Sequence, residues 1–287
     1  MKDSVMKGRT IALDTETTGM NPLTERLIEV AAVEMIDGEV TGKVFHELID
    51  PEKAVEAGAE KVHGWDTESI RHELKTGKQY PKYKEVYEQL RETQKFHHIA
   101  DRLKEFIGDS VVHAHNAPFD KGFLDMEFER LGQPKLSEAV KFHCTLKSAS
   151  AIRPRRQNTL DILAKLYGLK TDSYGGLEGN SHVTEQFKSV CKDLGIDPTD
   201  RDEHAALKDT LILCHVARNL MSPENELILR GGENETDEMN VARVHKRRVA
   251  GGDRPILVPA NAEESQAHRK LMERIGKESG KDISPSF

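Results

Sequence analysis

Apolar stretches that suit β-strands dominate the first fifty residues. Thr10–Asp14 has the composition of a buried central strand. Leu27–Ile36 and Val40–Ile49 flank the dipeptide Asp37-Gly38, which is typical of a tight hairpin turn. The pattern therefore predicts three antiparallel strands at the start of the domain.

Further along the chain, apolar residues recur at three- and four-residue spacing, as on one face of a helix. This spacing predicts a helical stretch over Tyr80–Ile107 that Gly108 ends. A strand at Ser110–His115 then leads into a helix that has Pro118 in its first turn and ends near Leu131. A short strand at Lys141–Cys144 and helices that begin near Asn158 and cover Val183–Leu194 and His204–Met221 complete the alternation. We expect one α/β domain over residues 1–220.

The character of the chain changes after this region. Residues 221–240 include an acidic run without apolar periodicity, which predicts a flexible linker. Residues 241–287 combine a basic stretch, a short strand candidate at Pro255–Pro259 and a helix that begins at Asn261. This segment cannot bury a core of its own, so it either docks on a partner or stays disordered, and periodicity alone favours neither.

Composition excludes several classes of protein. Of 287 residues, 32% are charged and 37% hydrophobic, and the net charge is −7, so a generally basic nucleic-acid-binding surface is not expected. Three cysteines without C-x-x-C spacing exclude a disulfide framework and a zinc ribbon. No apolar run is long enough to span a membrane, which predicts a cytoplasmic protein without membrane contact.

Two carboxylates in the first strand suggest chemistry. Asp14 and Glu16 lie two residues apart, so on a strand both side chains project to the same side. Two such carboxylates repel each other unless a cation lies between them, and oxygen ligands suit Mg²⁺ or Mn²⁺. Alone, the pattern is more often two solvated acids at a strand end, so further acids are needed to support a metal site.

Three later residues supply such support. Asp120 lies in the first turn of a helix, where a capping role is the simpler explanation. His204 and Asp209 are five residues apart, about 140° around an ideal helix, so His204 would have to precede the helix and fold back. Each residue alone is unremarkable, but four acids and one imidazole in this order predict a hydrolytic site with two divalent ions.

The same residues carry a family resemblance. The chain resembles the DEDD exonucleases of the histidine type on a ribonuclease H-like fold, and among them the epsilon proofreading subunits of bacterial DNA polymerase III. The segments that carry the resemblance are LDTETTGMN (13–21), KVHGW (61–65), VVHAHNAPFDKGFLDMEF (111–128), NTLDILAKLYGL (158–169) and HAALKDTLIL (204–213). The resemblance implies a mixed sheet of about five strands flanked by helices, with a C-terminal extension.

Catalytic roles follow from this resemblance. Asp14 is expected to bridge two Mg²⁺ or Mn²⁺ ions, Glu16 and Asp209 to hold one of them, and Asp120 to support the other. His204 is expected to take the proton from the attacking water. The residues expected to position the 3′ end of the strand are Thr15, Thr17, Thr18, Met20, His63, Trp65, Asn116 and Phe119, although loop packing explains several of them equally well.

The resemblance also implies a substrate and partners. It predicts 3′→5′ removal of nucleotides from a single-stranded or frayed DNA end, with 241–287 docking on a polymerase catalytic subunit. The alternatives are an RNA-trimming exonuclease of the same superfamily and an inactive structural subunit. Relative to the family pattern, extra residues lie between Trp65 and Gly108 and between Lys170 and His204. The family's glutamine-led sliding-clamp motif is replaced at best by a weakened version at Glu226–Leu229.

Overall fold

The computed structural model describes residues 8–154, 156–169, 176–180, 183–200, 205–222 and 225. The expectations for His204, for most of the linker, for Glu226–Leu229 and for 241–287 lie outside these residues. Contacts divide the chain into the units Met1–Val241 and Ala242–Phe287, and all described residues belong to the first.

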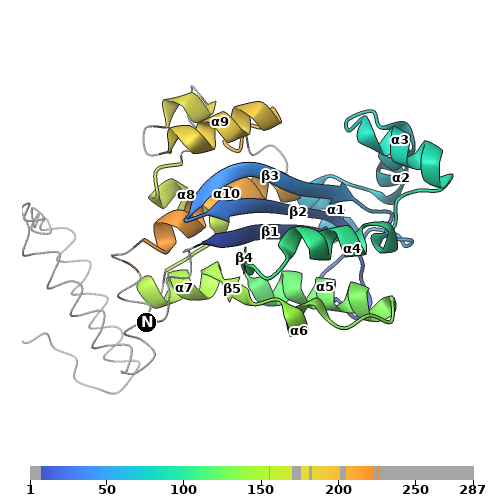
Figure 1. The fold of residues 1–287 in the computed structure, drawn as a ribbon, viewed down its shortest axis with the longest axis horizontal. Coiled ribbons are helices and arrows are strands. Elements are labelled where there is room, and N and C mark those ends of the chain that lie inside the picture. The colour runs from blue at the N-terminus through green and yellow to red at the C-terminus, as the bar shows by residue number, and fades with distance from the viewer. Residues whose placement is uncertain are drawn as a thin grey trace, which may run out of the picture. The chain divides into compact units, whose positions relative to one another are not determined.

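A five-stranded mixed sheet forms the centre of this unit (Figure 1). Its strands are β1 (Arg9–Thr17), β2 (Leu27–Ile36), β3 (Glu39–Leu48), β4 (Val111–Ala114) and β5 (Phe142–Cys144), in the order β3-β2-β1-β4-β5. The first three strands pair antiparallel, whereas β4 and β5 run parallel to β1. The predicted mixed sheet with an antiparallel opening is therefore confirmed.

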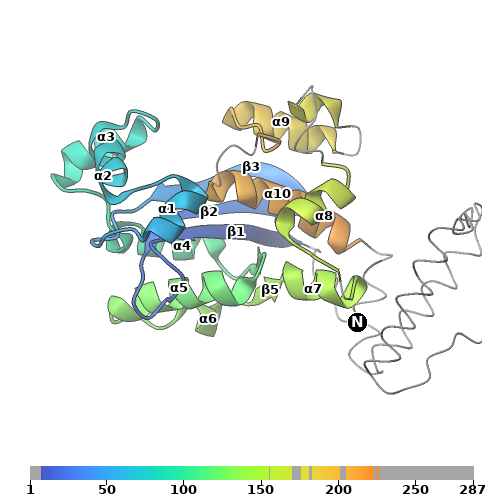
Figure 2. The ribbon, with the colours of Figure 1, turned by 180° about the vertical axis from the view of Figure 1, so that it is seen from behind.

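Alternate residues of β1 enter two separate cores, as the two-residue period of a strand requires. Ile11 and Leu13 pack with α4 (Phe96–Ile107) and α5 (Ala117–Arg130), whereas Ala12 packs with α10 (Ala206–Leu220). Figures 1 and 2 show these helices on opposite faces of the sheet. Asp14 and Glu16 share the alternation of Ala12, so they belong to the α10 face.

Other helices lie around this framework. They are α1 (Ala57–His63), α2 (Thr67–Thr76), α3 (Lys82–Leu90), α6 (Leu136–Ala139), α7 (Thr145–Ile152), α8 (Leu160–Leu166), the 3₁₀ turn η1 (Gly176–Gly179) and α9 (Glu185–Leu194). Among the residues that the structure describes, no helix combines the length and apolar character that a bilayer crossing requires.

The extra residues after Trp65 form a helical arm, α2 and α3, at one end of the sheet (Figure 1). The prediction of one continuous helical stretch over 80–107 was wrong. The region holds two helices, and α3 ends at Arg91, whose φ of 59° is left-handed. Tyr83 is the fully buried residue of α3. Its hydroxyl accepts the backbone N–H of Leu48 at 2.5 Å and so attaches the arm to β3.

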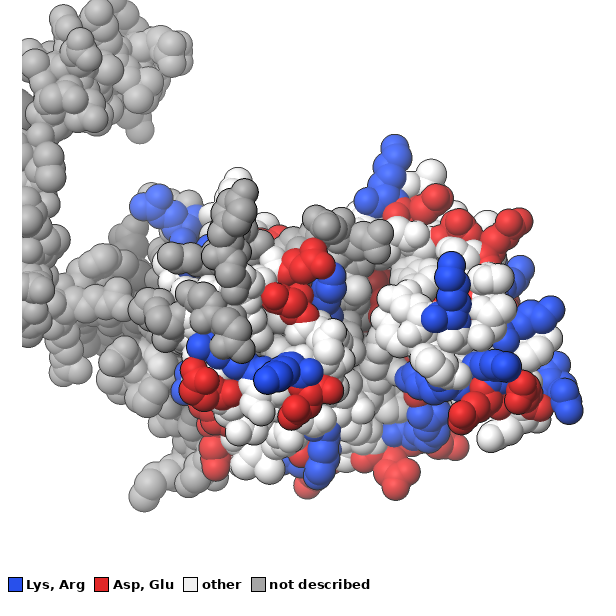
Figure 3. All heavy atoms as spheres, turned by 90° about the horizontal axis from the view of Figure 1, so that it is seen from above, with Lys and Arg blue, Asp and Glu red and all other residues white. Residues whose placement is uncertain are grey.

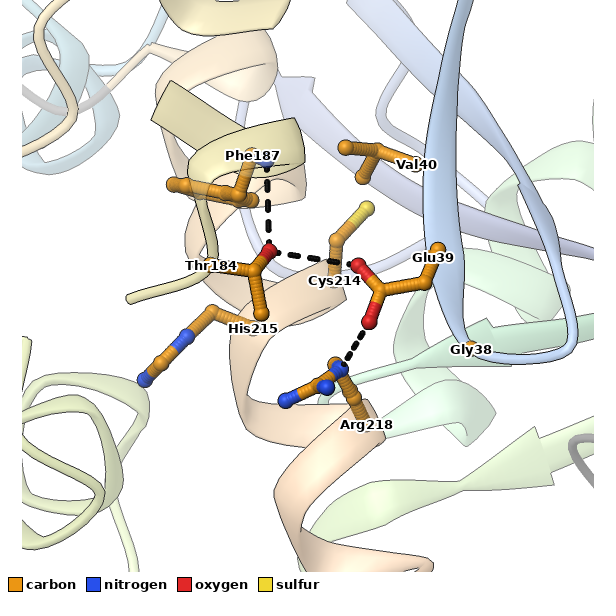
Figure 4. Close-up of a pocket in the computed structure, with 8 residues that line it drawn as sticks. All are labelled: Gly38, Glu39, Val40, Thr184, Phe187, Cys214, His215 and Arg218. Carbon is orange, nitrogen blue, oxygen red and sulfur yellow. Dashed lines mark hydrogen bonds and ion pairs between the residues drawn. The ribbon is translucent and has the colours of Figure 1, made fainter. Parts of the chain in front are cut away.

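The second set of extra residues includes α9, which packs beside the β2–β3 hairpin. There Glu39 accepts hydrogen bonds from Thr184 at 3.2 Å and from Arg218 of α10 at 2.7 Å (Figure 4). The small pocket around these residues is also lined by Phe187 and His215, both buried. The ring of His215 contacts the carbonyl oxygen of Tyr167 at 3.1 Å. The polar side chains that line this pocket therefore bond within the protein and join α9 and α10 to the hairpin.

Candidate metal centre

Three carboxylates meet where β1 passes under the first turn of α10. Asp14 and Glu16 come from β1, and Asp209 comes from α10, which packs across β1 and β2. Each of the three offers a carboxylate oxygen, and these oxygens all lie within 4.8 Å of one another. Asp209 is buried, whereas Asp14 and Glu16 remain partly exposed, so the group is reachable from outside.

Asp120 approaches from the other side of β1. The parallel pairing of β1 and β4 brings the carboxyl ends of both strands to one edge, and α5 starts directly after β4. Asp120 lies in the first turn of α5, is 2% exposed, and accepts a hydrogen bond of 2.8 Å from the hydroxyl of Thr15. It is not one of the three clustered acids, but its charge acts strongly on Asp14.

The electrostatics of these acids indicate a place for a cation. Burial, followed by the charges of Asp120, Glu16 and Asp209, holds the pKa of Asp14 well above its usual value. Burial also raises the pKa of Asp120 to about 7. A divalent ion would offset this repulsion, and a donor set made only of carboxylate oxygens fits Mg²⁺ or Mn²⁺. The described residues therefore fit the expected ions.

Removing one charge from this group should stabilise the metal-free protein. Because their pKa values are raised, Asp14 and Asp120 stay protonated in the folded state at pH values above 4, where the unfolded chain has released these protons. The free energy of unfolding therefore falls as pH rises through 7. We expect Asp14→Asn to melt a few degrees higher than wild type in EDTA at pH 8, since 1 kcal/mol corresponds to about 2–4 °C in a domain of this size. Differential scanning calorimetry at pH 8 and pH 5 measures this, and the gain should shrink at pH 5.

Glu34 provides the control, because it is a carboxylate in the same sheet, buried on β2, but has Arg9 as its partner. Hydrogen bonds from Arg9 and Thr41 lower the pKa of Glu34 despite its burial. Glu34→Gln should therefore lower the melting temperature at pH 8, opposite in sign to Asp14→Asn. An Asp14→Asn protein that melts below wild type at pH 8 without metal would contradict the repulsion described above.

The three threonines expected near the substrate use their hydroxyls within the protein. Thr15 donates to Asp120, Thr17 donates to the carbonyl oxygen of Gly19 at 2.7 Å, and Thr18 donates to Glu25 at 2.6 Å. All three residues are buried. Their side chains shape the loop that follows β1, which leaves the backbone of this loop as the part available to a ligand.

Of the remaining residues expected to contact the substrate, His63 is buried and the others are exposed or half-buried. His63 is buried, with Nε2 at 3.2 Å from the carbonyl oxygen of Thr17 and Nδ1 accepting the N–H of Trp65, so its ring ties α1 to the end of β1. Met20, in contrast, is 77% exposed. Asn116 is exposed and has a left-handed φ of 71°. Phe119 is half-buried, and its ring centroid lies 4.9 Å from that of Phe123. Trp65 is half-buried against the core that includes Tyr83.

Comparison with known proteins identifies the family. The RNase_T family model, described as an exonuclease, matches residues 11–91 and 84–174. The chain belongs to this exonuclease family.

Relatives in the family match most of the chain. DNA polymerase III subunit epsilon from Haemophilus influenzae is 31% identical over 95% of this chain and 92% of its own length. The protein of the same name from Buchnera aphidicola is 38% identical over 70% of this chain and 90% of its own length. Among solved structures, an exonuclease I matches with a TM-score of 0.49 and 15% identity over 83% of this chain and 47% of that one.

Two residues beside the carboxylates of this exonuclease were missed by sequence reasoning. Glu29 is buried opposite Glu16 in the β1–β2 pairing, and its charge acts on Asp14. His115 lies just after β4, where burial lowers its pKa while the nearby charge of Asp209 opposes this shift. The signal for Glu29 was present, because an acid inside the apolar run LIEVAAV faces the same side of the sheet as its cross-strand neighbour.

A second group of possible ligands, Glu92, His97 and His98, does not fit an ion as arranged. The backbone N–H of Lys95 donates to Nδ1 of His98 at 3.0 Å, so in the neutral ring Nε2 carries the proton. That Nε2 faces Glu92 at 3.3 Å. These contacts explain the group as part of the start of α4.

Charges of both signs are present on the face of the molecule that Figure 3 shows. Blue and red side chains are interspersed there over the described residues. This mixture agrees with the net charge of −7.

Proposed function

We propose that this chain is a metal-dependent 3′→5′ exodeoxyribonuclease that removes terminal nucleotides as the proofreading subunit of a replicative DNA polymerase. The observation that carries the proposal is the gathering of Asp14, Glu16 and Asp209 within 4.8 Å, with Asp120 next to Asp14. Family membership and relatives named DNA polymerase III subunit epsilon support it. A cytoplasmic location follows from the proposed partner.

The proposed chemistry is hydrolysis of the last phosphodiester bond. Two divalent ions would supply charge stabilisation to the attacking and leaving oxygens of an in-line displacement. Asp14, on which the charges of the other acids act, would hold the ions together with Glu16, Asp209 and Asp120. His204 would accept the proton of the attacking water, since an imidazole pKa near ~6.5 suits a base at neutral pH.

The strand end would be held by the surfaces around this group. Met20 is exposed at the tip of the loop after β1, where it is free to pack against a terminal base. Asn116 and Phe119 flank the first turn of α5, one helical turn or less from Asp120. Because the threonine hydroxyls bond within the protein, we propose that backbone groups of Thr15 and its neighbours contact the terminal sugar.

Hydrolysis assays on end-labelled primers test the proposal. With Mg²⁺, the chain should release 5′-mononucleotides from a DNA primer with a mispaired 3′ end faster than from a fully paired one. A single-stranded RNA of the same sequence separates the alternative RNA-trimming activity. Preference for RNA, or release from the 5′ end, would overturn the proposal, and no activity on any substrate would favour an inactive structural subunit.

Docking on a polymerase catalytic subunit through 241–287 is a separate part of the proposal. It is supported by the relative that matches 95% of this chain, because such a match must extend beyond the exonuclease domain. Pull-down of the polymerase subunit by the full chain should succeed and should fail with a chain that ends at residue 240. Equal capture by both would contradict docking through this segment. Clamp binding at Glu226–Leu229 is tested in the same way with purified clamp.

A further inference from the structure

Glu29 is a charged residue in the middle of the sheet. It lies on β2, opposite Glu16 on one side and Leu48 on the other, and is 2% exposed. An acid at such a position costs free energy unless it is hydrogen-bonded, and this one also lies close to the negative charge of Asp14. Its retention beside the carboxylates requires an explanation beyond packing.

The side-chain partners of Glu29 provide one. Nε2 of His46, from β3, lies 2.5 Å from one carboxylate oxygen. The second oxygen accepts the backbone N–H of Ala206 at 3.4 Å. Ala206 is the first residue of α10, and the preceding residue, Ala205, makes no side-chain cap. Glu29 therefore supplies from the sheet the acceptor that a helix start normally obtains from its own N-cap, at the end where the helix dipole favours a negative charge.

This bond lies one turn from a proposed metal ligand. Asp209 is in the same first turn of α10. The hydroxyl of the neighbouring Thr210 donates to the carbonyl oxygen of Ala206 at 2.7 Å and also lies 3.3 Å from the carbonyl oxygen of Ala31 on β2. The side chains of Glu29 and Thr210 thus both lie between β2 and this turn. Loss of the Glu29 bond would free the end that carries Asp209.

We propose that Glu29, oriented by His46, is a positioning residue that holds the first turn of α10 so that Asp209 meets Asp14 and Glu16 in ion-binding geometry. This inference rests on the proposed metal-dependent function.

The α2–α3 arm covers the far side of His46. The ring of Tyr80 stands edge-on to the His46 ring at 5.2 Å and 81°, and Lys82 donates to the His46 carbonyl oxygen. Backbone N–H groups of Gln79 and Tyr80 in turn donate to the buried Glu73 of α2. The arm thereby restricts the imidazole to the orientation that faces Glu29, which gives these extra residues a function in supporting the site.

Glu29→Ala tests the proposal on the full chain with two readouts that do not depend on activity. Hydrogen exchange of the amides of residues 206–209 should accelerate in the metal-free variant. The dissociation constant for Mn²⁺, measured by calorimetry, should rise about 10- to 100-fold, as for other residues that orient metal ligands. Glu29→Gln keeps an oxygen for the Ala206 N–H and should recover most of both losses.

Glu34→Ala is the matched control, because it removes a buried glutamate from the far end of the same strand. It should lower stability but leave Mn²⁺ affinity and exchange at 206–209 unchanged. Unchanged Mn²⁺ binding by a folded Glu29→Ala protein, or an equal loss in Glu34→Ala, would overturn the proposal. A wild-type chain that binds Mn²⁺ but releases no nucleotide would refute only the proposed nuclease function, whereas one that binds no Mn²⁺ refutes both.

Discussion

Asp14→Ala should reduce nucleotide release to background while the protein stays folded. Asp14 is the acid on which the charges of Asp120, Glu16 and Asp209 all act, so its loss removes the carboxylate that interacts with all the other proposed ligands. Removing a single stabilising group from an active site typically costs about 10²–10³ in rate, and a shared ligand should cost more. The measurement is the single-turnover rate on a 5′-labelled DNA primer at saturating Mg²⁺.

Asp125→Ala is a suitable control for this loss. Asp125 is a buried carboxylate on α5 that accepts hydrogen bonds from Ser137, away from the cluster. That variant should be less stable than wild type yet keep its rate per folded molecule. If folded Asp14→Ala, checked by circular dichroism, retained Mg²⁺-dependent release, the carboxylates would have no catalytic role.

Local patterns were sufficient to predict the sheet. The Asp37-Gly38 turn fixed the β2–β3 hairpin, and the two-residue period of β1 placed Asp14 and Glu16 on one side. Short helices were harder to find. The short α1 and α7 were not anticipated, and α2 was missed although Asp66 and Ser69 form a capping box at its start.

Bringing Asp14 and Asp209 together was beyond any local pattern. The two residues meet only because α10 packs across β1, and their separation along the chain carries no signal for that contact. Family resemblance supplied the expectation. The 140° offset expected between His204 and Asp209 applies only if both lie on one helix. Because α10 begins at Ala206, His204 precedes the helix in sequence.

Buried polar residues are where sequence reasoning was weakest. Thr17 and Thr18 are expected to help position the strand end, and no local pattern indicated that their hydroxyls bond to Gly19 and Glu25. Glu29 stands out in the sequence as an acid in an apolar strand, but its partners come from β3 and from the start of α10, and no local pattern indicates them. A hydrogen-bond donor or acceptor finds its partner through the tertiary fold, whereas apolar periodicity reports only which side of an element is buried.

His204→Ala should lose rate without losing metal affinity. As the proposed base, His204 contributes proton transfer, which is typically worth about 10²–10⁴ in rate. The wild-type rate should rise with pH around the ordinary imidazole pKa near ~6.5, because only the neutral ring accepts a proton. The variant should lack this dependence. Single-turnover rates across pH 5.5–8.5, together with Mn²⁺ calorimetry, measure both properties on the same preparation.

His97→Ala controls for the general loss of an imidazole, because His97 is exposed at the start of α4 and lies outside the carboxylate group. It should keep the wild-type rate and its pH profile. The decisive comparison is between rate and binding in His204→Ala. A large fall in rate with Mn²⁺ affinity preserved makes His204 the base, whereas a parallel fall in Mn²⁺ affinity would instead make it a ligand of the ion, leaving the proton to another acceptor.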